Sequence, residues 1–200
     1  VSIWKSEALR SASDVAEIYN GGLPNDLNNL PTAPQPTTWF RMGENATWNG
    51  REFSMTDVNG GYVNTSIGIL PTDPNPTTDV PLFDNKSLTY DGISDYISTA
   101  QISLLSVNTI SFWVKNSSTS QGTIFGDVWA TSNYSLYWIP STNNIYFRLG
   151  NSHSGYWELQ VSSGLLSDGN WHHHCLSRNA LILNYYIDGV LQTNVTNNTL

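Results

Sequence analysis

The stretch that decides the fold reads Ser167-Asp-Gly-Asn-Trp-His-His-His-Cys-Leu-Ser-Arg178 and continues as Leu181-Ile-Leu-Asn-Tyr-Tyr-Ile-Asp-Gly-Val-Leu-Gln-Thr193. It predicts three short strands, of which the second and third are joined by Asp188-Gly189. Both residues tolerate a positive φ, which favours a tight two-residue hairpin turn. Side chains alternate along the second strand, so one face would carry Leu181, Leu183, Tyr185 and Ile187. The stretch therefore predicts antiparallel β-sheet.

Composition excludes several classes of function. The chain has 200 residues, with 8 Lys and Arg against 16 Asp and Glu, and carries a net charge of −8. A surface with that balance repels phosphate backbones, so nucleic-acid binding is not expected. No apolar run is long enough to span a bilayer, which predicts no membrane insertion. The single cysteine, Cys175, excludes a disulfide within the chain.

Short strands separated by turn residues follow one another from Leu82 onward, as in a sandwich or jelly roll. In residues 109–115, apolar side chains occupy every second position, as the inner face of a sandwich requires. The predicted strands are residues 87–90, 96–98, 109–115, 122–127, 134–139, 144–149, 157–162, 171–178, 181–188 and 190–196.

The first 38 residues have a different pattern. Val1-Ser-Ile-Trp4 alternates like the end of a strand, and Ser11 with Asp14 has the spacing of a helix capping box. Apolar residues then recur at helical spacing until Gly21-Gly22 ends the helix. The four prolines of residues 23–38 indicate an extended connector. We therefore divide the chain into a strand-helix segment (1–22), a Pro-rich linker (23–38) and a β domain (39–200).

Four motifs occur in order along the chain. They are Ser87-Leu-Thr-Tyr-Asp-Gly-Ile-Ser-Asp-Tyr-Ile97, Asn108-Thr-Ile-Ser-Phe-Trp-Val-Lys115, Asp168-Gly-Asn-Trp-His-His173 and Tyr186-Ile-Asp-Gly-Val190. Together they resemble the jelly-roll domains of the laminin-G-like, concanavalin A-like lectin/glucanase superfamily. The resemblance implies an all-β fold: a two-sheet antiparallel jelly-roll sandwich with one short N-terminal helix.

The ends of the resembled domain occur in an unusual order. Trp39-Phe-Arg-Met-Gly-Glu44, with the turn at 57–61, is similar to the superfamily's opening strand, and residues 1–22 are similar to its closing strand and helix. The closing segment therefore comes first. Residues 1–22 either finish a preceding jelly roll in a tandem array, or fold back as a permuted last strand beside residues 39–42.

We favour the array as the origin of this order, which makes the sequence an excerpt of a longer protein. Jelly rolls joined by Pro/Thr linkers are similar to those in large structural and tail-associated proteins of marine bacteriophages and in bacterial surface adhesins. The partners would then be neighbouring copies or adjacent jelly-roll domains. The proposed assembly segment consists of Val1, Ile3, Trp4, Val15, Ile18 and Tyr19.

Catalysis is not expected from the carboxylates. Retaining glycoside hydrolysis needs two carboxyl groups about 5–5.5 Å apart. Glucanases of the resembled superfamily place them on one strand as Glu-X-Asp-X-X-Glu, and this pattern does not occur in the sequence. The chain is therefore expected not to be an enzyme.

Two groups of side chains raise the question of a metal site. His172, His173 and His174 are consecutive, but strand alternation puts His173 on the opposite face, so we interpret all three as scaffold. Ca²⁺ is the better candidate, since relatives in the resembled superfamily bind it through loop aspartates. The candidate ligands are Asp84, Asp91, Asp95 and Asp127. No compact motif unites these aspartates, and the simpler interpretation makes them turn-forming residues.

Aromatic side chains in and near loops are the best candidates for ligand binding, because sugars stack on aromatic rings. The residues that fit are Trp129, Tyr134, His153, Tyr156 and Trp157. The competing interpretation is that they pack in the core or in cross-strand pairs.

The leading hypothesis is a non-catalytic structural or adhesion module of a fibre-like assembly that is extracellular, on a cell surface or in a virion. The alternative is a lectin domain that binds glycans through loop aromatics, with Ca²⁺ assisting.

Overall fold

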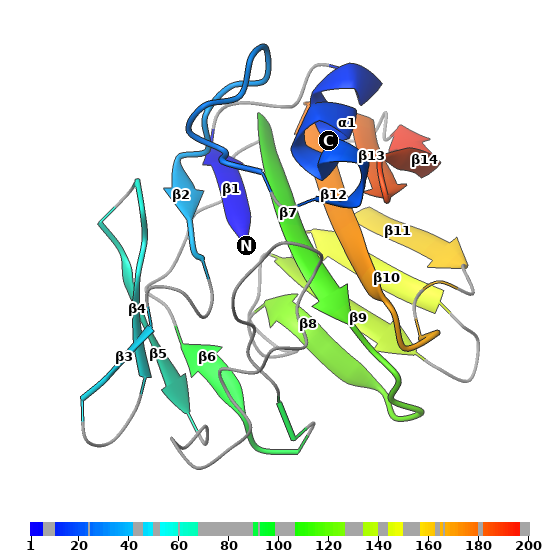
Figure 1. The fold of residues 1–200 in the computed structure, drawn as a ribbon. Coiled ribbons are helices and arrows are strands. Elements are labelled where there is room, and N and C mark those ends of the chain that lie inside the picture. The colour runs from blue at the N-terminus through cyan, green and yellow to red at the C-terminus, as the bar shows by residue number, and fades with distance from the viewer. Residues whose placement is uncertain are drawn as a thin grey trace.

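Antiparallel β-sheets dominate the part of the chain that the computed structural model describes (Figure 1). The structure describes residues 1–5, 11–23, 25–41, 46–49, 53–59, 61–67, 90–91, 93–98, 107–126, 134–139, 144–149, 157–162, 165, 167–179 and 182–196. Within these ranges there are three sheets, one α-helix and one short 3₁₀-helix. The all-β sandwich class expected from the sequence is confirmed.

The largest sheet has six strands. In spatial order they are β14 (Val190–Thr196), β13 (Ile182–Ile187), β12 (Trp171–Asn179), β7 (Val107–Lys115), β1 (Ser2–Lys5) and β2 (Thr38–Trp39). Adjacent strands are antiparallel, and the longest pairing joins β12 to β7 from Trp171↔Lys115 to Asn179↔Val107. β7 and β12 thus form the centre of the sheet.

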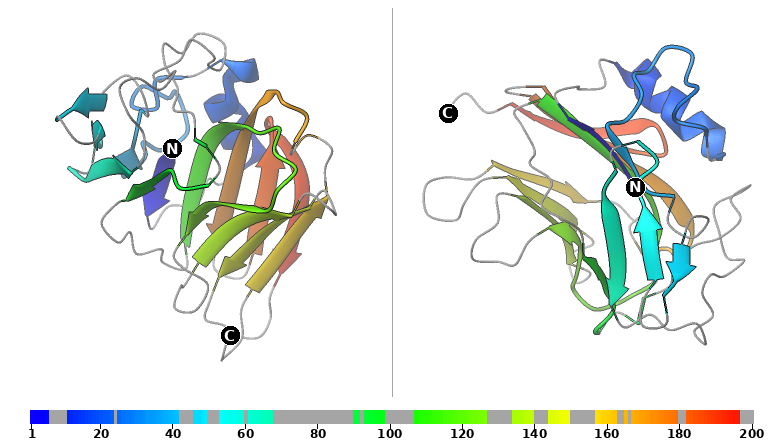
Figure 2. Two further views of the ribbon diagram at one scale, coloured as in Figure 1. Left: turned by 90° about the horizontal axis from the view of Figure 1, so that it is seen from below. Right: turned by 90° about the vertical axis from the view of Figure 1, so that its left-hand side faces the viewer.

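A second sheet packs against one face of the first, and the two layers are seen edge-on in Figure 2. Its strands, in spatial order, are β11 (Trp157–Ser162), β10 (Asn144–Leu149), β9 (Tyr134–Ile139) and β8 (Gly122–Gly126). The core between the layers consists of Ile3, Phe40, Ile110, Phe112, Leu136, Ile145, Phe147, Leu159, Val161, Leu176, Leu183, Tyr185 and Ile187. Ile110 and Phe112 of β7 contribute to it, with Val114 packed against it, and β13 contributes Leu183, Tyr185 and Ile187. This is the alternation that the sequence predicted; Leu181 lies outside the described residues.

The turn between β13 and β14 has the conformation that its sequence predicts. Asp188 has a φ of 51° and Gly189 a φ of 76°. A Cβ atom added at Gly189 would lie 3.1 Å from Cδ1 of Tyr19. Glycine is therefore required here both by the positive φ and by the close approach of the Tyr19 ring.

Helix α1 (Ala12–Tyr19) lies on the outer face of the six-stranded sheet, away from the second sheet (Figure 2). The predicted capping box is confirmed: the Asp14 N–H donates to Oγ of Ser11 at 3.2 Å, and the Ser11 N–H donates to Oδ2 of Asp14 at 2.9 Å. Asn20, with a φ of 49°, ends the helix, and η1 (Asn20–Gly22) follows. The helix packs on the sheet through a second core cluster of Trp4, Val15, Ile18, Leu27, Ala33, Cys175 and Tyr186.

The N-terminal strand lies within the chain's own sheet. β1 pairs with β7 through Ser2↔Ser111 and with β2 through Ser2↔Trp39. This is the folded-back arrangement of the two that the sequence left open. The side chains proposed as an assembly segment accordingly pack inside the same chain: Ile3, Trp4, Val15 and Ile18 are buried, and Val1 and Tyr19 are half-buried. In this conformation the four buried side chains cannot contact a neighbouring copy.

The Pro-rich stretch 23–38 differs from the extended linker that the sequence suggested. Leu27 and Ala33 are buried beneath α1, and the Trp4 indole N–H donates to the carbonyl of Pro34 at 2.7 Å. The physical reason is that Trp4 points out of the sheet on the side away from the main core. The Pro-rich stretch covers this large apolar ring together with the helix.

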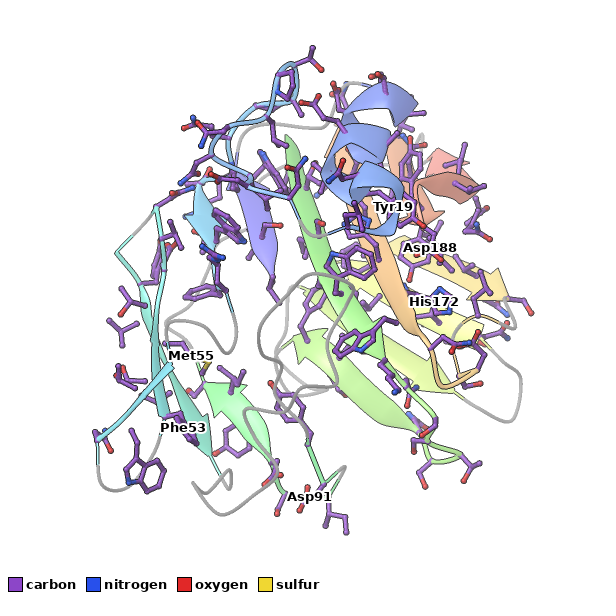
Figure 3. The ribbon with its side chains drawn as sticks, in the orientation of Figure 1. Tyr19, Phe53, Met55, Asp91, His172 and Asp188 are labelled. Atoms are coloured by element: carbon purple, nitrogen blue, oxygen red, sulfur yellow. The ribbon has the colours of Figure 1, made fainter. Side chains whose placement is uncertain are left out.

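A third sheet was not included in the two-sheet expectation. It contains β3 (Ala46–Trp48), β4 (Phe53–Thr56), β5 (Val63–Ile67) and β6 (Tyr96–Ser98) in that order. Phe53 and Met55 are buried on β4 (Figure 3). Of the strand predicted at 87–90, residues 87–89 lie outside the described residues, and Tyr90 is not in a strand. The other predicted strands from Tyr96 onward are present to within two residues at each end, wherever those ends are described.

Candidate functional site

The three consecutive histidines of β12 are the first group of ionisable side chains to consider as a site. Their positions opposite β7 are His172↔Val114, His173↔Trp113 and His174↔Phe112. Alternation therefore places His172 and His174 on the face toward the second sheet and His173 on the face toward α1. Each ring has different partners, and these decide what each histidine can do.

His173 is a buried neutral ring under the end of the helix. Its Nε2 lies 2.6 Å from the Ser111 hydroxyl, and its ring contacts those of Tyr19 and Trp113, with centroids 5.9 and 5.3 Å away. Burial lowers the pKa of His173 to about 3. Its Nδ1 is buried and has no hydrogen-bond partner among the described residues. With its ring covered on the helix side, His173 is not accessible as a base or a ligand.

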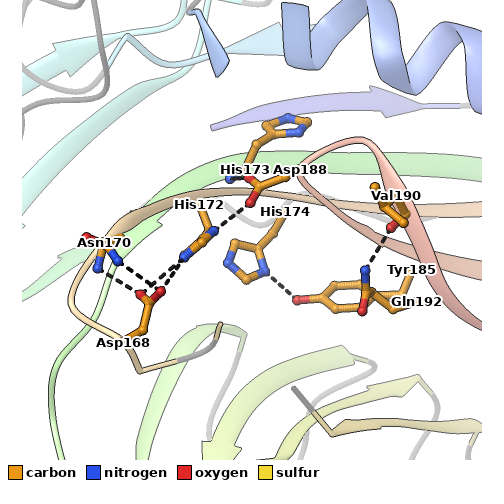
Figure 4. Close-up of polar contacts among 9 residues, drawn as sticks. All are labelled: Asp168, Asn170, His172, His173, His174, Tyr185, Asp188, Val190 and Gln192. Atoms are coloured by element: carbon orange, nitrogen blue, oxygen red, sulfur yellow. Dashed lines mark hydrogen bonds and ion pairs between the residues drawn. The ribbon is translucent and has the colours of Figure 1, made fainter. Parts of the chain in front are cut away.

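His174 is buried in the main core. Its ring stacks on Phe112 at 5.2 Å with 5° between the planes, and Nδ1 lies 2.5 Å from the Tyr185 hydroxyl (Figure 4). Burial lowers the pKa of His174 to about 3 and raises that of Tyr185. A neutral imidazole whose Nδ1 accepts a hydrogen bond from the phenolic O–H gives both of these atoms a partner inside an apolar layer.

His172 lies between two carboxylates. Nδ1 is 2.6 Å from Oδ2 of Asp188, and Nε2 is 3.1 Å from Oδ1 of Asp168 (Figure 4). Burial opposes a positive charge on this ring, but hydrogen bonds to Asp188 and Asp168 outweigh it and raise the pKa of His172 above its usual 6.5. The pKa of Asp168 is lowered, first by its hydrogen bond with Asn170. The three groups form an ion-paired cluster that ties two turns together.

The histidines of β12 do not form a metal site with their described neighbours. Among the described residues, no group of three or more His, Cys, Asp and Glu side chains could hold a metal ion. Both nitrogens of His172 face carboxylates, and His173 and His174 lie on opposite faces of the sheet. Cys175 is buried, and burial raises the pKa of its thiol, which keeps it protonated.

Asp91 and Asp95, two of the four proposed calcium ligands, lie close together, and both accept hydrogen bonds from the backbone of their own loop. The Asp91 carboxylate accepts hydrogen bonds from the backbone N–H groups of Ile93, Ser94 and Asp95 at 2.7, 2.8 and 3.1 Å. These bonds hold the pKa of Asp91 well below its usual range. Asp95 accepts from the Asp91 N–H at 3.0 Å. The pair lies far from the histidines (Figure 3), and Asp84 and Asp127 lie outside the described residues.

The proposed sugar-binding aromatics lie at the border of the described structure. Trp129, His153 and Tyr156 are outside it, and for Tyr134 and Trp157 the structure describes the backbone. Tyr134 begins β9 and Trp157 begins β11, and both pair with Leu149 of β10. Their backbones therefore lie in one row, two strands apart, or about 10 Å.

Every carboxylate that the structure describes accepts a hydrogen bond from its own chain. These carboxylates cap α1, hold turns, fix the entry to β2 or contact His172. They are Asp14, Glu17, Asp26, Asp57, Asp91, Asp95, Asp168 and Asp188. Asp57 is an example: its Oδ1 accepts from the N–H groups of Trp39 and Asn59 at 2.7 and 2.9 Å.

Sequence reasoning missed Asp168 and Asp188 as partners of His172. The available signal was Asp168 four residues before the histidine, together with Asp188 in the hairpin turn.

The geometry defines the class of this protein as an antiparallel jelly-roll sandwich with a helix on its outer face. Comparison with known families agrees. Residues 91–200 match the sequence model of the concanavalin A-like lectin/glucanases superfamily, and the chain belongs to this superfamily. The resemblance carried by the four motifs is confirmed.

Other comparisons gave weaker relationships. The chain is similar to the solved structure of an S-layer domain-containing protein (residues 221–444) from Clostridium thermocellum. The identity is 19%, the match covers 78% of this chain and 70% of that one, and the TM-score is 0.44. No curated protein matches this chain. No helix among the described residues is long and apolar enough to cross a membrane.

Proposed function

We propose that this chain is a non-catalytic structural or adhesion module of an extracellular, cell-surface or virion assembly. The observation that carries the proposal is that the described carboxylates and histidines hydrogen-bond within the chain itself. Every described carboxylate holds the chain's own backbone or a histidine, and two of the three consecutive histidines are buried and neutral. A hydrolytic site would instead need carboxylates that face a substrate.

Contacts between copies are proposed at the edge of the six-stranded sheet. β14 is the outer strand there, and the sequence Val190–Thr196 has no charged residue. Val190 and Leu191 are 62% and 45% exposed. Edge strands without charges or proline are templates for pairing with another chain. In a chain of net charge −8, this uncharged edge is where two copies meet with little electrostatic repulsion.

The test is self-association measured by sedimentation velocity over a range of protein concentrations. The wild-type chain is expected to form dimers or larger species that the double variant Val190→Lys/Leu191→Lys does not form. Val63→Lys is the matched control, because Val63 is 54% exposed on β5 of the third sheet. It should associate like the wild type.

A parallel assay separates the competing functions. Incubation with a panel of polysaccharides, followed by reducing-end detection, is expected to show no bond cleavage. Cleavage would overturn the non-catalytic proposal. A chain that stays monomeric but binds glycans on an array would overturn the assembly role and favour the lectin alternative.

A further inference from the structure

His172 bridges two turns that are distant in the sequence. Asp188 belongs to the turn between β13 and β14, and Asp168 belongs to the turn that precedes β12. The ring contacts Asp188 through Nδ1 at 2.6 Å and Asp168 through Nε2 at 3.1 and 3.2 Å (Figure 4). His172 itself is 8% exposed, so water has little access to replace a lost partner.

The protonation state of the ring decides whether both contacts are favourable. A neutral imidazole has one N–H donor and one nitrogen lone pair, whereas the imidazolium has two N–H donors. Carboxylate oxygens only accept hydrogen bonds. A neutral His172 would therefore point a lone pair at one of the two carboxylates, and the protonated ring satisfies both.

We propose that His172 is a proton-operated latch, which fastens the 167–170 turn to the β13–β14 turn when its ring is protonated and releases Asp168 when the ring is neutral. Asp168 is the partner released because its contact with the ring, at 3.1 Å, is longer than the 2.6 Å contact of Asp188. Asp188 stays in place because its Oδ1 also accepts from the His173 N–H at 2.9 Å.

The surroundings of His172 favour the protonated ring and therefore the closed latch. Among the described residues, the ionisable groups around it are Asp168, Asp188, the flanking His173 and His174, and the Tyr19 phenol, whose pKa is raised by burial and by Asp188. His173 and His174 are neutral at pH 7, since their pKa values are about 3, so neither opposes the charge on His172. The latch is closed below the raised pKa of His172 and opens as the pH rises through it.

Opening has a local structural consequence. The 167–170 turn keeps a second attachment, because the Gly169 N–H donates to the carbonyl of Asn116 at the end of β7, at 3.1 Å. The turn is therefore expected to loosen at Asp168 without leaving the sheet. The amide of Asn170, which donates to Oδ1 of Asp168, reports on this change.

The first test is an NMR titration of the histidine ring nitrogens. In the wild-type chain, both nitrogens of His172 are expected to be protonated at pH 6, with a titration midpoint above 6.5. At high pH the remaining proton should stay on Nδ1, which faces Asp188. Asp168→Asn and Asp188→Asn should each lower the midpoint. Asp26→Asn is the matched control and should leave it unchanged, because Asp26 lies in a turn without contact to His172.

The second test follows the turn itself by amide hydrogen exchange. The Asn28 N–H donates to Oδ1 of Asp26 at 3.1 Å, in the same geometry as the Asn170 N–H with Asp168. The ratio of the Asn170 and Asn28 exchange rates is expected to rise as His172 loses its proton. It should not change with pH in Asp168→Asn, in which the charged partner is already absent. A His172 midpoint at or below 6.5, or a ratio independent of pH in the wild-type chain, would overturn the proposal.

Discussion

Acidification from pH 7 to pH 5 is expected to destabilise the fold through His173 and His174. Both rings are buried and neutral, with pKa values of about 3 against 6.5 for an unperturbed histidine. Below pH 6.5 the unfolded chain binds protons at these two residues and the folded chain does not, so stability falls as the pH falls. At pH 5 each histidine costs about 2 kcal/mol, or about 4 kcal/mol together, by the linkage relation. This is a large part of the 5–15 kcal/mol that stabilises a typical domain.

The assay is urea unfolding at pH 7, 6 and 5, with the free energy of unfolding extrapolated to water. The double variant His174→Phe/Tyr185→Phe removes one titrating ring together with its hydrogen-bond partner. Phenylalanine at position 174 keeps an aromatic ring that can stack on Phe112 as His174 does. The loss of stability between pH 7 and pH 5 should then fall by about 2 kcal/mol, because one proton fewer is linked to unfolding.

A matched variant separates the effect of His174 protonation on stability from the effect of losing the Tyr185 hydroxyl. Tyr185→Phe alone keeps His174, so it should lower stability at all three pH values while remaining acid-sensitive. Equal unfolding free energies of the wild-type chain at pH 7 and pH 5 would refute the reasoning. So would a double variant as acid-sensitive as the wild type.

Three further substitutions, with Gly21→Ala as a control, test the packing of the N-terminal segment, each by thermal or urea unfolding. Ser11→Ala removes the N-cap hydroxyl of α1 and should cost about 1 kcal/mol. Gly189→Ala adds a Cβ that would lie 3.1 Å from Cδ1 of Tyr19, at a residue whose φ is 76°. It should lower the free energy of unfolding more than Gly21→Ala does. At Gly21 the φ is 64°, and no atom lies within 4 Å of an added Cβ. Equal costs would show that the contact with Tyr19 is unimportant. Trp4→Phe removes the indole N–H that donates to a backbone carbonyl of the Pro-rich stretch, and about 1–3 kcal/mol should be lost.

Local features of the fold could be predicted from the sequence, because their causes are local. The β13–β14 turn follows from the tolerance of Asp188 and Gly189 for positive φ, and the capping box from the spacing of Ser11 and Asp14. Strand alternation correctly separated His173 from its two neighbours. Each of these features is decided within a few residues of the chain.

Long-range features could not be predicted in the same way. The place of β1 between β7 and β2 depends on pairing partners far away in the sequence, and either arrangement satisfied the local pattern. The covering of Trp4 by the Pro-rich stretch depends on which face of β1 the main core leaves open. The partners of His172 come from two turns that approach each other only after β12, β13 and β14 have paired.

The candidate site shows the same difference between local and long-range features. Strand alternation and the resemblance favoured a scaffold role for the histidines, and the structure buries His173 and His174; sequence reasoning did not indicate the ion-paired cluster around His172. The sequence offers the loop aspartates Asp91 and Asp95 as candidate calcium ligands, with turn formation as the simpler interpretation. Their hydrogen bonds to the backbone depend on the loop conformation, which the sequence does not specify.

The central claim is that the ionisable groups of this sheet serve the fold and are not a reactive site. One histidine titration by NMR tests it most directly, because three adjacent residues of one strand must give different results. His172 is expected to titrate above 6.5, while His173 and His174 stay neutral until the chain unfolds in acid. Three midpoints near 6.5 in the folded chain would mean that all three rings are open to solvent, and would contradict the account.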